Sequence, residues 1–129
     1  MASDEIDFTQ ARQCACAAAR RKSRELTRFY ERAMRGSGLR GPQFTLLATL
    51  IRTGATPTTR LADFLGLERT TLTRNLRPLL RDGLVTIEDA ADRRVHKVAI
   101  TAKGAAAAER AYPFWRKAQD AALARLPGS

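Results

Sequence analysis

The stretch DAADRRVH, residues 89–96, gathers charged side chains where a β-hairpin would turn. The runs LVTIE before it and KVAIT after it alternate apolar and polar residues, as half-buried strands do. Five of its eight residues can carry a charge, and none is Gly or Pro. Paired arginines at the tip of a hairpin can reach along a nucleic-acid backbone into a groove, which is the first chemistry that these residues suggest.

A second group of side chains with this chemistry lies in LERTTLTRNLRPLLRDGL, residues 67–84. Its leucines follow the i, i+4, i+7, i+8 spacing of one buried helix face. The other faces carry hydroxyl, amide and guanidinium groups, which can meet phosphates and base edges. These candidate DNA-binding residues are Thr70, Thr71, Thr73, Arg74, Asn75 and Arg77. The alternative is an ordinary solvated helix face.

The helix over residues 68–82 follows a shorter one, and together they predict a helix-turn-helix. The shorter helix opens near TPTT, residues 56–59, and stops at Gly66, where a left-handed C-terminal residue fits. A turn of about three residues joins the two helices, and the second helix of such a motif enters the major groove of DNA. The hairpin that follows directly would form a wing beside it.

Further helices flank this motif. Residues from about 9 to 35 have helical apolar periodicity, and GSGLRG then breaks the chain. Gly41 and Pro42 are expected as the N-cap and the first residue of the next helix, QFTLLATLIR, whose nearly uniform apolar character predicts burial. Pro78 predicts a kink or an early loosening of its helix, and Pro113 predicts a bend in the last one.

Composition supports an anionic partner and a single domain. The chain has 129 residues, a net charge of +10 and a pI near 11.0, which favour nucleic acid or a membrane surface as partner. No apolar run approaches the length of a membrane span, and the acidic start MASDEIDF is unlike a signal peptide. We therefore expect a cytoplasmic protein without membrane association, and two cysteines agree with a reducing compartment.

The run GLVTIEDAADRRVHKVAITAKG, preceded by LADFLGLERTTLTRNLRPLLRDG, resembles the winged helix-turn-helix of the MarR family of bacterial transcription regulators. The resemblance covers about residues 10–126. Its most specific parts are DRR in the wing, RDGLV before the wing, and ITAKG after it, where the family has L-T-x-x-G. It implies a mainly α-helical fold with a small β-hairpin wing, which is an α+β class.

The resemblance also implies the organisation of the chain. Residues 1–129 would form one domain, with the winged helix-turn-helix at about 41–101 and the wing at about 85–101. Helices at about 9–36 and 102–126 would build a homodimer. Members of the family usually have one more helix after the long one that follows the wing, so this chain departs from the pattern at its end.

The function implied by the resemblance is that of a sequence-specific, dimeric regulator of double-stranded DNA, usually a repressor. The helix at 68–82 would lie in the major groove and the wing at 89–96 in the minor groove. By position, Arg94 would enter that groove beside Arg93, and Asp92 would brace it. A carboxylate that holds the guanidinium in advance reduces the roughly 2 kcal/mol of rotamer entropy that fixing an arginine costs.

The resemblance also implies a means of release from DNA: many relatives bind a small aromatic or phenolic effector, and some sense an oxidant through a cysteine near the N-terminus. Five aromatic residues can line such an effector pocket or simply form core: Phe29, Tyr30, Phe44, Tyr112 and Trp115. Cys14 and Cys16 can sense oxidants or be inert helix residues. On a helix, side chains two residues apart point in different directions, so we expect neither a mutual disulfide nor a shared metal, and no cofactor.

Two other classes of function are open to a basic chain of this kind. A non-specific, nucleoid-type nucleic-acid-binding protein would bind operator and random DNA equally well. An enzyme is not expected, because the sequence has no nucleophile paired with a base, no carboxylate pair and no phosphate-binding loop. GSGLRG lacks the Lys-Ser/Thr ending of such a loop.

Overall fold

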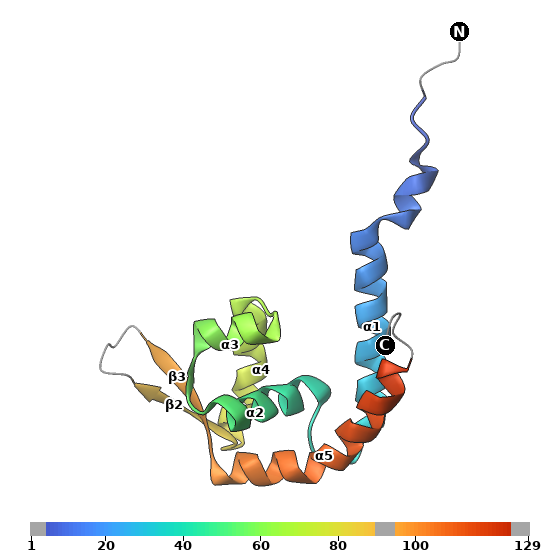
Figure 1. Ribbon diagram of the computed structural model, residues 1–129. Coiled ribbons are helices and arrows are strands. Elements are labelled where there is room, and N and C mark those ends of the chain that lie inside the picture. Colours follow the sequence, from blue (N-terminus) through green and yellow to red (C-terminus); the bar gives the residue numbers. More distant parts are fainter. Residues whose placement is uncertain (1–4, 90–94, 125–129) are drawn as a thin grey trace.

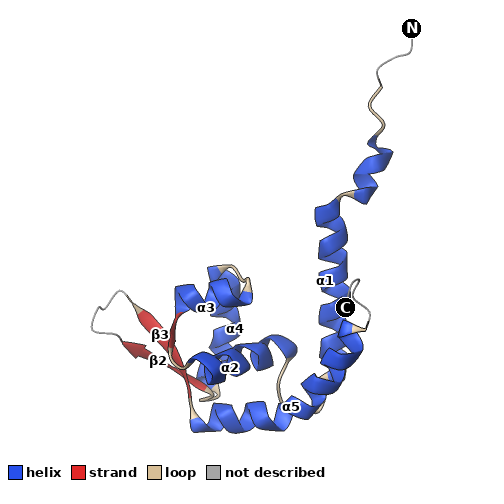
Figure 2. Ribbon diagram, in the orientation of Figure 1, coloured by secondary structure: helices blue, strands red, loops and turns tan. Residues whose placement is uncertain are grey.

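The computed structural model describes residues 5–89 and 95–124. A small sheet lies among helices (Figure 2), which confirms the predicted fold class. The elements follow the chain in this order: the 3-10 helix η1 (Phe8–Gln13), α1 (Ala15–Ala33), α2 (Gly41–Thr53), β1 (Thr56–Pro57), α3 (Thr58–Leu65), α4 (Arg69–Arg81), β2 (Val85–Asp89), β3 (His96–Ile100) and α5 (Ala102–Leu123).

The helices divide the molecule into a winged part and a helical stalk. Figure 1 shows α2, α3, α4 and the sheet on one side, with β2 and β3 projecting from it. α5 runs from the sheet to α1 and curves upward in its second half, in agreement with the bend predicted from Pro113. The N-terminal end of α1 and η1 extend away from the rest of the chain, so the stalk carries the winged part at one end only.

The sheet has the strand order β1-β3-β2, and both pairs are antiparallel. The predicted hairpin is confirmed, with Val85 opposite Ile100 and Asp89 opposite His96. Asp89 and His96 are therefore strand residues, and the tip is shorter than the eight residues read from the sequence. The shorter helix predicted to open near TPTT is α3, which begins at Thr58, and the two residues before it, Thr56 and Pro57, pair with β3. Proline is tolerated there because β1 is an edge strand.

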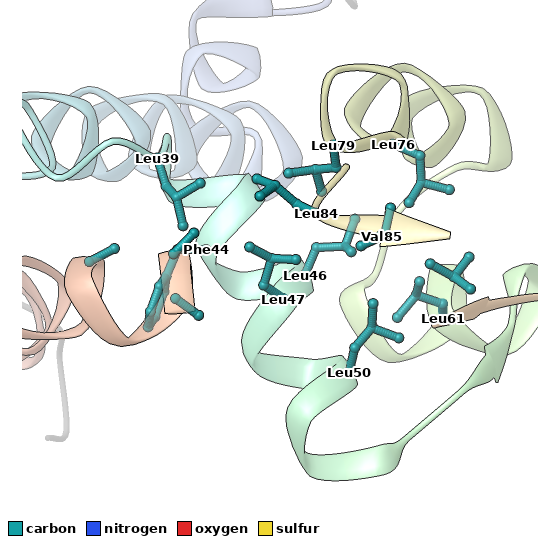
Figure 3. Packing of buried hydrophobic residues seen from close by; sticks show 14 of the residues in the cluster. Leu39, Phe44, Leu46, Leu47, Leu50, Leu61, Leu76, Leu79, Leu84 and Val85 are labelled. Carbon is teal, nitrogen blue, oxygen red and sulfur yellow. The ribbon is translucent and has the colours of Figure 1, made fainter. Parts of the chain in front are cut away.

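The core is centred on α2, as its uniform apolar sequence predicted. Figure 3 shows the side chains of Leu46, Leu47 and Leu50, with Leu46 near Val85 of β2 and Leu50 near Leu61 of α3. All three are at most 1% exposed. Phe44, on the same helix, packs toward α5. Burying side chains of this size contributes roughly 1.5 to 3 kcal/mol each, so α2 is the element around which α4 is held in place.

The helix predicted from about residue 9 to 35 is interrupted. Cys14 has extended backbone angles, φ −55° and ψ 124°, and separates η1 from α1, which ends at Ala33. No residue of η1 is buried, and Ile6 and Phe8 are more than 70% exposed. A helical pattern without packing partners is only marginally stable, which explains why the periodicity alone predicted too long a helix.

Two predictions about prolines and caps also need correction. Arg40, and not Gly41, is the N-cap of α2, so Pro42 is the second residue of the helix. The Gln43 side chain accepts the backbone N–H of Arg40 at 2.9 Å, a role that the sequence reading had left unassigned. α4 continues through Pro78 to Arg81, and the kink or loosening expected at Pro78 stays a prediction. Gly66 has φ 64° and ψ 34° and ends α3 as predicted.

Candidate nucleic-acid interface

α4 presents one face to the core and the opposite face to solvent. Leu72, Leu76 and Leu79 are buried against α2 and α3. At about 100° per residue, Thr70, Arg74 and Arg77 lie on the side of the helix turned away from these leucines. All three are exposed. The leucines therefore fix the rotation of α4 about its axis, and that rotation decides which side chains can meet DNA.

The other predicted residues of α4 lie on its two flanks. Thr73 is exposed toward the sheet, and its hydroxyl donates a hydrogen bond of 2.9 Å to the Arg69 carbonyl. Its lone pairs can still accept. Thr71 and Asn75 lie on the opposite flank and are half-buried. The structure thus separates the six predicted residues into an outward group, one residue facing the sheet and a half-buried pair.

The outward face of α4 is positively charged. Among the residues that the structure describes, neither Arg74 nor Arg77 has an ion-pair partner, whereas Arg81 pairs with Asp82 at 3.2 Å. Uncompensated guanidinium groups are stabilised by an anion that approaches them, and each can bind a phosphate or the edge of a guanine in two places. The arrangement can therefore bind polyanions and also discriminate among bases.

The wing begins with β2 at Val85, as the sequence predicted. β2 and β3 project from the same side of the molecule as α3 and α4 (Figure 1). A groove of about 430 Å³ lies between α4 and the sheet. Thr58, Arg69 and Arg77 are among its lining residues. Asp92, Arg93 and Arg94 lie outside the described residues, so their predicted roles stay predictions.

Comparisons with known proteins place the chain in a family. A family model described as MarR family matches residues 37–95. The chain is similar to the transcriptional regulator MosR of M. tuberculosis, solved in complex with DNA, with 44% identity, a TM-score of 0.78, and coverage of 88% of this chain and 84% of that chain. The chain belongs to the MarR family. The predicted resemblance and the winged helix-turn-helix are therefore confirmed.

Other structures share the fold of this MarR-family protein at lower identity. A probable transcriptional regulator from Pseudomonas aeruginosa is 22% identical, with a TM-score of 0.77 and coverage of 92% of this chain and 89% of that chain. BpsR of Bordetella bronchiseptica, whose DNA binding is regulated by 6-hydroxynicotinic acid, is 23% identical, with a TM-score of 0.74 and coverage of 88% and 86%. No curated protein sequence matches the chain.

A second site of interest in this MarR-family protein is a groove where α1, α2 and α5 meet. Its volume is about 650 Å³, and its lining is mainly apolar, with Lys22 at its edge. The Tyr30 hydroxyl donates a hydrogen bond of 2.5 Å to Gln119 Oε1, which ties α1 to α5. Burial raises the pKa of Tyr30, so its hydroxyl stays protonated and able to donate at neutral pH. Lys22 and Gln119 could not be predicted from the sequence as groove residues, because only the fold brings them together.

The five aromatic residues predicted for an effector pocket do not form one cluster. Tyr30 and Trp115 line the groove, and Phe44 is buried with its ring 5.2 Å from that of Trp115. Tyr112 is about half-exposed and stacks at the edge of this pair. Phe29 lies at a different hollow, between α1 and α5. Two of the five can therefore touch a ligand in the groove, while Phe44 is core.

Cys14 and Cys16 are both exposed at the start of α1. Cys14 precedes α1, so the expectation that both cysteines are helical was wrong. That the two thiols form neither a disulfide nor a shared metal site stays a prediction. Hydrogen bonds from the backbone N–H groups of Ala17 and Cys16 lower the pKa of the Cys14 thiol, and the Cys16 side chain contributes further. A thiolate at Cys14 is thus favoured by the first turn of α1.

Neither a metal centre nor a membrane span is found in the described part of the chain. Over residues 5–89 and 95–124, no three His, Cys, Asp or Glu side chains come together to hold a metal ion. None of the described helices is sufficiently long and apolar to cross a bilayer.

Proposed function

We propose that this protein is a homodimeric transcriptional repressor that reads a specific DNA site with α4 in the major groove and the wing in the adjacent minor groove. The observation that carries this proposal is the outward face of α4, where Thr70, Arg74 and Arg77 are exposed on a helix whose rotation is fixed by buried leucines. The similarity to MosR, solved bound to DNA, supports it.

A two-fold dimer built from α1 and α5 accounts for apolar surface that one chain leaves uncovered. None of the residues Ala15–Ala33 of α1 is buried. A hollow of about 640 Å³ between α1 and α5 is lined by Phe29, Pro113 and Phe114, among others. Leu123, near the end of α5, is 43% exposed. Apolar surface of this kind on a helical stalk favours a second copy of the chain as the partner.

Selection of bound genomic fragments, followed by footprinting, tests this function. We expect an inverted repeat whose half-site centres lie one helical turn apart, about 10 bp, because each recognition helix reads one half-site. A single asymmetric half-site, or a monomeric mass in solution, would contradict the proposal. A specificity ratio near one against random DNA would instead support the non-specific nucleic-acid-binding alternative.

We further propose that a small aromatic effector occupies the groove at α1, α2 and α5 and releases the repressor from DNA. Its volume suits a small ligand. BpsR, a relative in fold, is regulated by such a molecule. Trp115 lines the groove and is the only tryptophan in the sequence, so its fluorescence should change as candidate compounds bind. Ala19→Phe, which fills the groove, should abolish the change while operator affinity stays within about twofold; an unaltered fluorescence response would contradict this site.

Release by an oxidant is a second proposal, and it rests on Cys14. Its exposed position at the start of α1 and its lowered pKa favour reaction with hydrogen peroxide, in which the thiolate attacks one oxygen and hydroxide leaves. Peroxide should release parent protein from its operator, while Cys14→Ser should stay bound and Cys16→Ser serves as the matched variant. Equal release of parent and Cys14→Ser would show that Cys14 is not the sensor.

A further inference from the structure

The turn between α4 and β2 is held by the beginning of α5. Three successive carbonyl oxygens in this turn, those of Asp82, Gly83 and Leu84, all accept hydrogen bonds from one short segment. Lys103 Nζ donates to Asp82 at 2.8 Å, and the Thr101 hydroxyl donates to Gly83 at 2.7 Å. The backbone N–H of Thr101 donates to Leu84 at 3.1 Å. We call residues 82–84 and 101–104 the α4–α5 junction.

Thr101 is the central residue of this junction because its hydroxyl has two partners. While it donates to the Gly83 carbonyl, its oxygen accepts the Gly104 N–H at 3.0 Å and so caps α5. The same side chain thus begins α5 and binds the end of α4. The Gly104 backbone lies so close to the turn that an added Cβ would be 2.1 Å from the Leu84 oxygen.

The junction is also bonded directly to the two elements that reach DNA. Leu84 donates its N–H to the Leu79 carbonyl of α4 at 2.8 Å. Val85, the next residue, begins the wing and pairs with Ile100, which precedes Thr101. The end of α4, the base of the wing and the first turn of α5 therefore form one hydrogen-bonded unit.

We propose that Thr101 is a positioning residue for DNA binding: it sets the angle between α5 and the unit formed by α4 and the wing, and thereby the separation of the two recognition helices in the dimer. The proposal rests on the proposed dimeric function, in which α5 belongs to the dimer interface. Thr101 itself is half-buried at the base of the wing and lies in the junction rather than on the outward face of α4.

The geometry makes small changes at the junction consequential. α4 has 13 residues, and at 1.5 Å per residue its far end lies roughly 18 Å from the junction. A rotation of roughly 10° at the junction would move that end by about 3 Å, which is close to the 3.4 Å between successive base pairs. Loosening the junction should therefore weaken the preference for one half-site spacing before it abolishes DNA binding.

The test compares Thr101→Val with Thr101→Ser, which keeps both hydrogen bonds of the hydroxyl. Each protein is titrated with the operator that the parent selects and with versions one base pair shorter or longer between the half-sites. The parent and Thr101→Ser should prefer the selected spacing by about tenfold or more, as they would over a mismatched base. For Thr101→Val we expect this preference to fall by about threefold or more.

A purely structural role would give a different result. If Thr101→Val only lowers the folded fraction, its affinity falls equally for all three operators and the preference is unchanged, which would overturn the proposal. A parent that does not distinguish the spacings would overturn the dimeric function as well, so the two failures can be told apart. Should Thr101→Val not fold, Lys103→Met, which removes only the bond to Asp82 from an exposed side chain, decides the question by the same ratio.

Discussion

Gly104 provides the most direct test of the packing between α5 and the end of α4. A methyl group at this position would lie 2.1 Å from the Leu84 oxygen and 2.9 Å from Ile100 Cγ1, whereas real Cβ atoms stay at least 3.0 Å from such neighbours. Backbone on one side or the other must therefore move by about 1 Å. Because Leu84 is buried and its oxygen accepts the Thr101 N–H, that movement disturbs the junction and not only a side chain.

Three effects determine how Gly104→Ala changes the free energy of unfolding: two of them lower it and one raises it. Overpacking costs about 1 to 3 kcal/mol, and weakening the hydrogen bond to Leu84 adds about 0.5 to 1.5 kcal/mol. Replacing Gly by Ala inside a helix raises the free energy of unfolding by about 1 kcal/mol. The substitution should therefore lower the free energy of unfolding by about 0.5 to 3.5 kcal/mol, although a glycine-to-alanine change in a helix ordinarily raises it.

Urea denaturation followed by Trp115 fluorescence measures this effect, with protein concentration held constant because a dimer's stability depends on it. Ala106→Gly is the matched control, since Ala106 is exposed on the same helix. It should lose about 0.5 to 1 kcal/mol through helix propensity alone. If Gly104→Ala proved as stable as the parent or more so, the close approach at the junction would be refuted.

The other predictions concern the DNA interface and the groove. Arg74→Ala should weaken operator binding by about 1 to 3 kcal/mol and relax the base preference if it makes a bidentate base contact, while a phosphate contact would instead lower affinity for all sequences and reduce the salt dependence. Arg94→Ala should cost about as much and Asp92→Ala less, with the double variant little worse than Arg94→Ala, whereas additive losses would disprove bracing. Tyr30→Phe should remove a loss of stability that the parent shows as pH rises above about 10, because burial raises the folded-state pKa of Tyr30 and such a group contributes stability only while its hydroxyl is protonated. Identical pH profiles for parent and Tyr30→Phe would contradict the burial of this hydroxyl.

The parts of the fold that the sequence predicted are those whose signals are local. Gly66 predicts the end of α3 because glycine readily adopts the left-handed conformation. The spacing of the leucines of α4 predicts which face of that helix is buried. The wing strands were visible for the same reason, since alternation is read from neighbouring residues. These local signals also located the outward face of α4.

The missed features depend on contacts between residues far apart in the sequence. β1 is two residues long and exists only because Thr56 pairs with Val98. The groove needs Gln119 beside Tyr30, which are 89 residues apart. The interruption at Cys14 reflects a lack of packing, which periodicity cannot report. Among the aromatic residues, only the fold could distinguish Phe44 in the core from Trp115 at the groove.

The central position of β3 has a consequence for synthesis on the ribosome. β3 supplies the middle strand of the sheet and the fully buried Val98, and it is made after α2, α3 and α4. Until then, Thr56 has no strand to pair with and the leucines of α2 lack the apolar cover that β3 and α5 provide. A nascent chain that already displays the arginines of α4 therefore cannot yet hold that helix in its final orientation. Operator recognition should therefore emerge only after β3 and α5 have been made.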